Sequence, residues 1–217
     1  MATILMKLSE GRAADHYNRW ISILTLWQDK AMRNYILKHL IPHRGRVLDI
    51  GCGTGKLLIE VGRRGSKGVG IDMNKLMLAV AQKESIKHNL GRRLKFIRGN
   101  ALNFQISEEP FDLVVSTLMI SELQPEELTE FIRNAAKFVK SGGMVAIGGE
   151  TELTGAFMFR IVSIIRRISY WIIGRLTELG PHPYHQVANA MKTAGLVPRY
   201  KVRFLEGLLT LYVAKAR

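Results

Sequence analysis

A run of glycines follows an apolar segment near residue 50. Gly51, Gly53 and Gly55 come directly after residues 46–50, and a helical pattern follows them. Glycines at such a turn let a ligand approach the backbone, and the helix N-terminus offers unpaired N–H groups to it. Lys56 stands where a dinucleotide loop needs its third glycine, and no Ser or Thr follows it as in a Walker loop. The loop therefore disfavours both ATP and NAD.

An acidic residue stands at an informative distance from this loop. Asp72 lies 21 residues after Gly51, at the end of the β-rich run 68–72. A carboxylate at this separation is placed to accept hydrogen bonds from the hydroxyl groups of a ribose. The alternative interpretation is that Asp72 caps the following helix. Loop and acid together predict a ligand that contains a nucleoside.

Short β-rich runs alternate with helical stretches through the middle of the chain. Such alternation predicts right-handed βαβ units and a mostly parallel, doubly wound α/β sheet. The interval 100–110 has no clear helical pattern. The predicted strands are 46–50, 68–72, 94–99, 111–116 and 143–148, and the predicted helices are 55–64, 74–89 and 125–140.

Both ends of the chain depart from this strand–helix alternation. Residues 1–44 show two helical stripes, the second of which ends before Pro42. Residues 149–185 read as a helical insertion, followed by a short helix over 184–194 and a hairpin of strands 197–204 and 208–215. The first stripe is Trp20, Ile23, Leu24 and Trp27, and the second is Ala31, Tyr35, Ile36, His39 and Leu40.

Over residues 45–148, with the terminal helix and hairpin, the sequence resembles the class I S-adenosylmethionine (SAM)-dependent methyltransferases. The matching motifs are Val-Leu-Asp-Ile-Gly-Cys-Gly-Thr-Gly (47–55), Gly-Ile-Asp-Met (70–73), Gly-Asn-Ala (99–101), Phe-Asp-Leu-Val-Val-Ser (111–116) and Lys-Ser-Gly-Gly (140–143). The resemblance implies a seven-stranded, mostly parallel, Rossmann-like sheet whose last strand is antiparallel. It further implies one domain over 1–217, made of a helical cap (1–44), a SAM-binding core (45–148), an acceptor-side insertion (149–185) and a terminal helix and hairpin (186–217).

The resemblance also implies roles for the motif residues. The glycine loop would pass beneath the methionine part of SAM, and Asp72 would hold the ribose. Asn100 and the Ala101 N–H would read the adenine, although Asn100 replaces the usual Asp and is alternatively a plain turn residue. Asp49 would orient the loop or the SAM ammonium. The implied cofactor-binding residues are Asp49, Gly51, Cys52, Gly53, Gly55, Asp72, Met73, Asn100, Ala101 and Ser116, the last through its carbonyl.

The single cysteine and the histidines limit the chemistry. Cys52 lies in the loop, where we interpret it as a packed thiol and not a nucleophile. Three metal ligands at suitable spacing are not visible, so no metal site is predicted. A base is needed only if the acceptor must lose a proton. Candidates for such a role on the acceptor side are Tyr17, Glu150, His182 and His185, with Trp20, Glu122 and Tyr184 nearby.

The charge of the chain leaves the acceptor open. Lys and Arg number 32 against 18 acidic residues, a net charge of +14. An excess of this kind favours a polyanionic partner, either nucleic acid or an anionic membrane surface. Arg160 and Arg167 fall on one stripe of an apolar helical segment, which is a lid, a packed helix, a membrane-surface helix or, less favoured, a contact for nucleic acid. These arginines also disfavour a spanning helix, and no secretory signal is visible, so a cytoplasmic protein is expected, with peripheral contact to a membrane left open.

The function predicted from these features is methyl transfer from SAM to a small-molecule or lipid-like acceptor. By resemblance, the closest group contains the quinone-biosynthesis methyltransferases. The segment Ser-Thr-Leu-Met (116–119) lacks the motif of nucleobase amino-methyltransferases. An RNA methyltransferase and a non-catalytic SAM-binding sensor stay open as alternatives. The oligomeric state is not predicted.

Overall fold

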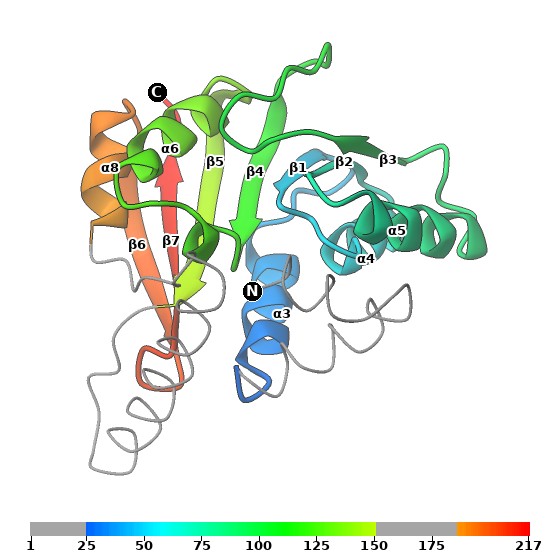
Figure 1. Cartoon of the computed structure of the whole chain (residues 1–217), viewed down its shortest axis with the longest axis horizontal. Helices are drawn as coiled ribbons and strands as arrows, with labels where there is room; N and C mark the ends of the chain where they lie inside the picture. The colour runs from blue at the N-terminus through cyan, green and yellow to red at the C-terminus, as the bar shows by residue number, and fades with distance from the viewer. Residues whose placement is uncertain (1–24, 151–185) are drawn as a thin grey trace.

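The computed structural model describes residues 25–150 and 186–217, whose strands form one seven-stranded sheet (Figure 1). The strands are β1 (Arg46–Ile50), β2 (Lys67–Asp72), β3 (Leu94–Arg98), β4 (Phe111–Thr117), β5 (Val139–Glu150), β6 (Val197–Phe204) and β7 (Leu209–Lys215). Their order is β3-β2-β1-β4-β5-β7-β6. β7 is antiparallel to both of its neighbours, whereas every other pairing is parallel. The predicted fold class is confirmed.

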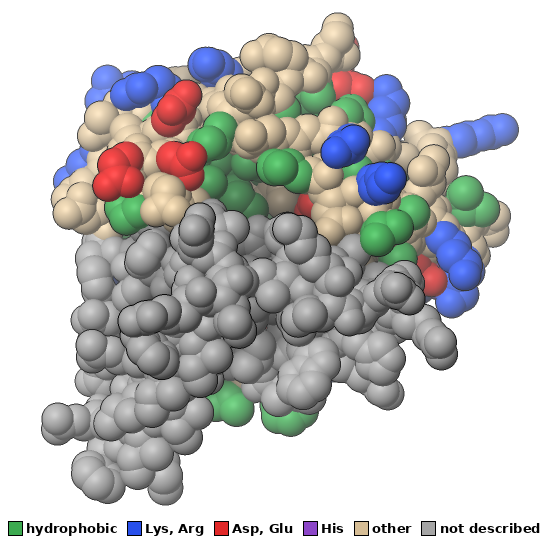
Figure 2. Space-filling view, in the orientation of Figure 1, with side chains coloured by type: hydrophobic (Ala, Val, Ile, Leu, Met, Phe, Trp, Pro, Cys, Tyr) green, Lys and Arg blue, Asp and Glu red, His purple; other side chains and the backbone are tan. Residues whose placement is uncertain are grey.

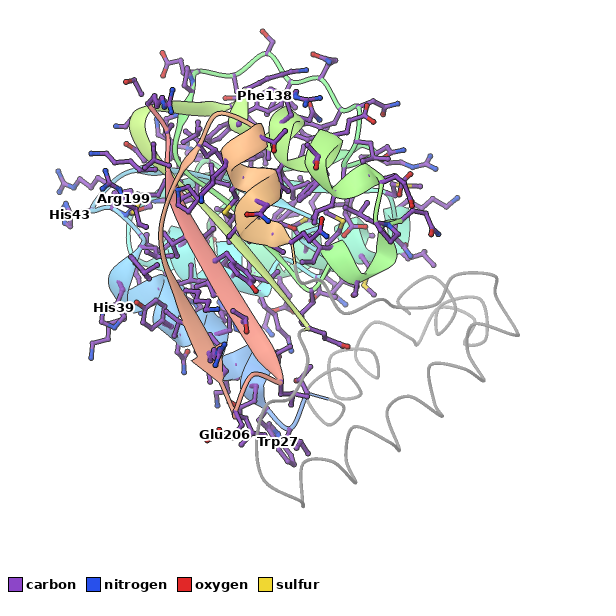
Figure 3. All side chains as sticks on the ribbon, turned by 90° about the vertical axis from the view of Figure 1, so that its left-hand side faces the viewer. Trp27, His39, His43, Phe138, Arg199 and Glu206 are labelled. Carbon is purple, nitrogen blue, oxygen red and sulfur yellow. The ribbon has the colours of Figure 1, made fainter. Side chains whose placement is uncertain are left out.

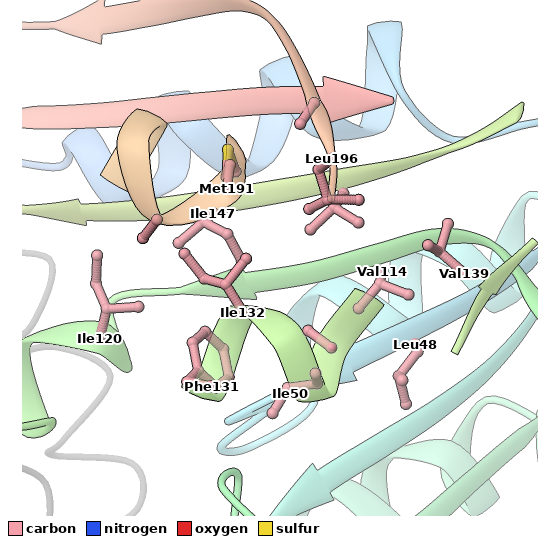
Figure 4. Close-up of a cluster of buried hydrophobic side chains, with 14 of the residues drawn as sticks. Leu48, Ile50, Val114, Ile120, Phe131, Ile132, Val139, Ile147, Met191 and Leu196 are labelled. Atoms are coloured by element: carbon pink, nitrogen blue, oxygen red, sulfur yellow. The ribbon is translucent and has the colours of Figure 1, made fainter. Parts of the chain in front are cut away.

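Helices cover both faces of this sheet. The described helices are α3 (Gln28–His39), α4 (Lys56–Arg63), α5 (Lys75–Lys87), the 3-10 turn η1 (Ile120–Glu122), α6 (Glu127–Ala136) and α8 (Val187–Thr193). Phe131 of α6 and Met191 of α8 belong to the buried cluster on one face (Figure 4). Met32 of α3 and Leu58 of α4 belong to the cluster on the other face. Among the described helices, none has the length and apolar character that a membrane span requires.

Strand alternation assigns the side chains of β1 to the two faces. Successive side chains of a strand point to opposite faces. Leu48 and Ile50 pack in the cluster with α6 and α8, whereas Val47 packs in the cluster with α3 and α4. Asp49 therefore points to the face that α3 and α4 cover. It lies one residue from the carboxyl end of its strand.

Two predicted boundaries differ from the structure in the region of the fifth strand. β5 begins at Val139 and not at 143, and its pairing with β4 shifts from Phe111↔Val139 to Leu113↔Met144. Gly142, with φ +75°, turns the chain inside that shift. α6 consequently ends at Ala136, before the predicted 140. Local propensity could not reveal this, because Val139 joins the sheet through a long-range pairing.

The predicted helical cap also needs correction within its described part. Trp27 has a left-handed φ of 60° and precedes α3, so it is not part of a continuous helix there. Its side chain is 61% exposed. His39, a member of the predicted apolar stripe, is exposed as well. Of the predicted stripe, Ile36 and Leu40 are buried, and Met32 and Leu37 are buried beside them.

Candidate cofactor site

A cavity lies where the carboxyl ends of β1 and β4 meet the glycine loop and α3. The strand order reverses between β1 and β4, and ligands of open α/β sheets bind at such switch points. In Figure 1 the arrowhead of β4 points to the edge of the sheet where α3 lies. The cavity is lined by Asp29, Met32, Arg33, Ile36, Asp49, Gly51, Cys52, Gly53, Thr54, Lys56, Leu57, Thr117 and Leu118.

The loop has its shape because three of its residues are glycines. Gly51, Gly53 and Gly55 have φ values of +75°, +53° and +72°, a region that side chains disfavour. The N–H groups of Gly51 and Cys52 both donate to the Ile71 carbonyl, at 2.7 and 3.0 Å. These bonds fasten the loop to the end of β2.

Asp49 is the buried acid of the cavity. Its side chain is 3% exposed, and its Oδ1 atom has no hydrogen-bond partner among the described residues. Burial, helped by the negative charge of Asp72, raises the pKa of Asp49 to about 7, while Arg33 opposes the rise. A cationic ligand group in this cavity would supply the missing partner.

Asp72 joins the loop to the next strand. Its Oδ2 accepts the Gly53 N–H at 2.8 Å, and its Oδ1 accepts the Asn74 N–H at 2.8 Å. The alternative that Asp72 caps the following helix is wrong, because Asn74 is the N-cap of α5 and accepts from the N–H groups of Leu76 and Met77. The Asp72 carboxylate therefore lies next to the glycine loop.

The third motif follows the neighbouring strand. The Gly99 N–H donates to the Asp72 carbonyl at 3.1 Å, which places residues 100 and 101 beyond the end of β3. Asn100 Oδ1 accepts the Leu102 N–H at 3.0 Å and so forms a local turn. The buried Asn134 of α6 donates from Nδ2 to the Ala101 carbonyl at 3.2 Å. Asn134 thus fixes the position of this turn.

Comparison with known proteins agrees with this geometry. Residues 47–143 match the family described as methyltransferase domain. The ubiquinone biosynthesis O-methyltransferase of Aliivibrio fischeri (strain MJ11) is 32% identical over 131 residues, which are 59% of this chain and 54% of that protein. Over residues 47–143 the chain is thus similar to the class I SAM-dependent methyltransferases.

Two further comparisons show how much of the chain is similar to known proteins. The demethylmenaquinone methyltransferase of Lactobacillus johnsonii is 27% identical over 140 residues, 63% of this chain and 57% of that protein. An O-methyltransferase family protein from Burkholderia thailandensis superposes with a TM-score of 0.76 at 23% identity, covering 96% of this chain and 61% of that one. This structural likeness shows the fold alone. The chain spans a little over half the length of these two curated relatives.

The structure places only part of the predicted cofactor set around the cavity. The cavity is lined by Asp49, Gly51, Cys52 and Gly53. Asp72 is joined to this lining because its carboxylate accepts the Gly53 N–H. The remaining predicted residues follow neighbouring strands or pack outside it. Met73 is 62% exposed beyond β2, Asn100 and Ala101 follow β3, and Gly55 is the N-cap of α4.

The side chains of two predicted residues, Cys52 and Ser116, pack within the fold. The Cys52 Sγ atom lies against the backbone of Gly70, where an added Cβ would come within 2.7 Å of it. Burial raises the pKa of the Cys52 thiol well above its usual range, so the thiol is protonated and a poor nucleophile. The Ser116 side chain is fully buried, and its Oγ has no partner in the described part of the chain. The neighbouring Thr117 is the residue that lines the cavity.

The acceptor-side candidates are only partly described. Glu150 ends β5, whereas Tyr17, His182 and His185 lie outside the described residues, as do Trp20, Tyr184 and the arginine stripe of the insertion.

Sequence reasoning missed the contribution of α3 to the cavity. Asp29 and Arg33 pair across one helical turn at 3.7 Å, a spacing that could have been noticed. Nothing in the sequence indicates that this pair faces Asp49. Leu118, also missed, has a left-handed φ of 64° directly after β4, an unusual conformation for Leu. Its N–H donates to the Gly148 carbonyl at 2.8 Å, which holds the chain in that conformation at the cavity wall.

Proposed function

We propose that this protein transfers the methyl group of SAM to a small-molecule acceptor. The observation that carries the proposal is the buried Asp49 carboxyl, which lines the cavity next to the glycine loop. Its Oδ1 has no hydrogen-bond partner among the described residues. An unpaired buried carboxylate is costly, and a bound ammonium would offset that cost. The amino acid part of SAM carries such an ammonium.

Different residues around the cavity would bind different chemical groups of the cofactor. Asp49 would accept from the ammonium, and Arg33 would donate to the carboxylate of the same amino acid group. The Asp72 carboxylate has about four acceptor sites, so ribose hydroxyls can share it with the two backbone N–H groups that it accepts. When bound, SAM supplies an electrophilic methyl group on a sulfonium. The chain contributes alignment and exclusion of water.

The acceptor that we favour is a quinone-type or related small ring compound. The supporting observation is that the first relatives are named for ubiquinone and menaquinone biosynthesis. Glu150 lies two residues beyond Gly148, the partner of Thr117 in the register of β4 and β5. We propose that its carboxylate accepts a proton from a ring hydroxyl group of the acceptor. Tyr17, His182 and His185 stay candidates for the same role.

An RNA acceptor has less support. The Lys and Arg side chains on the face shown in Figure 2 form separate groups with acidic side chains between them. A strand-binding surface would present a continuous basic track with aromatic platforms. A sensor without turnover has the same cofactor site, so only an assay of transfer separates it from an enzyme.

The deciding experiment follows the methyl group. The full chain is incubated with methyl-tritiated SAM and a lysate, and label is measured in lipid, small-molecule, RNA and protein fractions. Label in the lipid or small-molecule fraction, abolished by Asp72→Ala, supports the proposal. Label confined to RNA or protein, or SAM binding with no transfer at all, contradicts it.

Arg33 provides a first prediction for the cofactor site. Replacing it by Gln removes one charged contact to the SAM carboxylate, so we expect SAM affinity to fall about tenfold. Since Arg33 also opposes the rise in the pKa of Asp49, that pKa should move further upward in the variant. Calorimetric titration with SAM between about pH 6 and 7.5 measures both effects. Arg33→Lys, which keeps the charge, should recover part of the affinity, and equal affinities for all three proteins would contradict this role.

Two of the three loop glycines, Gly51 and Gly53, give a matched pair of variants. A Cβ on Gly51 would come within 2.5 Å of Met119, whereas a Cβ on Gly53 would meet no described atom within 4 Å. Both have positive φ, which costs each Ala about 1 kcal/mol. We expect Gly51→Ala to lower the melting temperature more than Gly53→Ala. The latter should keep its fold and lose SAM affinity, because its methyl group projects into the space that the cofactor would occupy. Unimpaired SAM binding by folded Gly53→Ala would contradict this placement.

A further inference from the structure

A second concave site lies at the opposite end of the sheet. It is a shallow pocket at the amino ends of β1, β2 and β3, and none of its lining residues is acidic. The β1 strand has five residues, so about 16 Å separates this pocket from the cofactor cavity at about 3.3 Å per residue. Figure 3 shows His43, which lines the pocket, and Trp27 at opposite ends of α3. The lining residues are His43, Arg44, Arg63, Arg64, Gly65, Lys67 and Arg93.

Two of the arginines are held in place by backbone carbonyls. Arg93 donates from Nη1 to the Gly65 carbonyl at 2.8 Å, and Arg64 donates from Nη1 to the Leu37 carbonyl. Each contact uses one of the five N–H groups of a guanidinium. The contacts orient both groups and leave further donors for a ligand.

The positive charge of the pocket is largely uncompensated. Arg63 is paired with Glu60 at 2.6 Å. Within the described part of the chain, no carboxylate oxygen lies within 4 Å of a charged nitrogen of Arg44, Arg64, Lys67 or Arg93. Cations gathered without counter-charges repel one another, and a bound anion would relieve that repulsion.

The geometry points to a phosphate group as the ligand: we propose that this pocket is an anion site for a phosphate-bearing molecule, separate from the cofactor cavity. Guanidinium forks and a lysine ammonium match the oxygens of a phosphate. The pocket faces away from the cavity, so it is not placed to deliver a membrane-dissolved acceptor to the methyl donor. It also lacks the Phe, Tyr and Trp rings that stack on the bases of a nucleic acid strand.

The test uses the full chain and pyrophosphate as the probe at low ionic strength. Arg44 and Lys67 are exposed, and neither side chain has a hydrogen bond or ion pair to another described residue. We expect the double variant Arg44→Gln/Lys67→Gln to bind pyrophosphate about tenfold or more weakly by calorimetry. SAM binding should be unchanged in the same variant, which shows that it is folded. Lys83→Gln, a loss of one exposed charge on α5, is the control and should bind pyrophosphate like the unaltered chain.

A parallel arm separates the two sources of a phosphate group. Sedimentation with phosphatidylglycerol vesicles is measured for the same three proteins. Vesicle binding that the double variant loses, without binding of pyrophosphate, assigns the site to a lipid headgroup. Binding of pyrophosphate that the double variant loses assigns it to a free phosphorylated ligand. If neither probe binds, or if the double variant binds both as the unaltered chain does, the proposal is overturned.

Discussion

Asp49→Asn is expected to make the ligand-free protein more stable at about pH 8 while removing most of its affinity for SAM. The pKa of Asp49 rises from 3.8 to about 7 on folding, mainly through burial. Between these values the folded state holds a proton that the unfolded state releases. The contribution of Asp49 to the free energy of unfolding is therefore fully present below about pH 4 and is lost as the pH rises through about 7. The loss at about pH 8 has an upper bound of about 4 kcal/mol.

The introduced amide would not ionise, so the Asp49→Asn variant escapes this loss. A buried amide with an unpaired donor has its own cost of about 1–3 kcal/mol, which reduces the gain. We expect the substitution to stabilise the free protein by about 1–3 kcal/mol at about pH 8 and not at about pH 4. Urea unfolding at the two pH values measures the difference. A variant less stable than the unaltered chain at both pH values would contradict the burial argument.

The same titration makes SAM binding depend on pH. An ionised Asp49 would hold the ammonium, so affinity should rise up to about tenfold per unit as the pH increases from about 5.5 toward 7 and then level off. Asp49→Asn should bind about 100-fold more weakly at about pH 7.5, with little dependence on pH. Glu130→Gln, an exposed change on α6, serves as the control. Affinities that are flat with pH in the unaltered chain would remove Asp49 from the proposed site.

Asp72→Ala is expected to reduce SAM affinity by about 100-fold or more, the second large effect. The carboxylate would contribute the ribose contacts, and it also accepts the N–H groups of Gly53 and Asn74 at 2.8 Å each. Removing it thus loosens the glycine loop in addition to removing a ligand contact. Stability should fall by about 1–3 kcal/mol because two backbone donors lose a charged acceptor.

Two controls separate loop geometry from ligand contact at Asp72. Asp72→Asn keeps one acceptor oxygen, so it should recover part of the stability and part of the SAM affinity. In either variant the pKa of Asp49 should move down, because the negative charge of Asp72 contributes to its rise. Normal SAM titration by Asp72→Ala would contradict the assignment of the ribose site.

The positions that could be predicted from sequence are those set by local spacing. The glycine loop, the strands around it and the separation of Gly51 from Asp72 are consecutive features of one βαβ unit. Period-2 and helical patterns are local as well, which is why β1 and β4 lie close to their expected bounds. The antiparallel pairing of β6 with β7 follows from the predicted hairpin, whereas the family resemblance supplied the seven-stranded sheet that contains them.

Only the tertiary structure decided which residues share a cavity. Arg33 of α3 lines the same cavity as Asp49 of β1 and acts on its pKa, and no spacing in the chain encodes that proximity. The pairing of Asn134 with the Ala101 carbonyl and the early start of β5 are likewise long-range. The net charge of +14 can be counted from the sequence. The basic side chains that line the pocket with Lys67 and Arg93 come from distant segments, which meet only in the folded chain. Local pattern determines elements and their motifs, whereas packing between distant segments determines which side chains face one another.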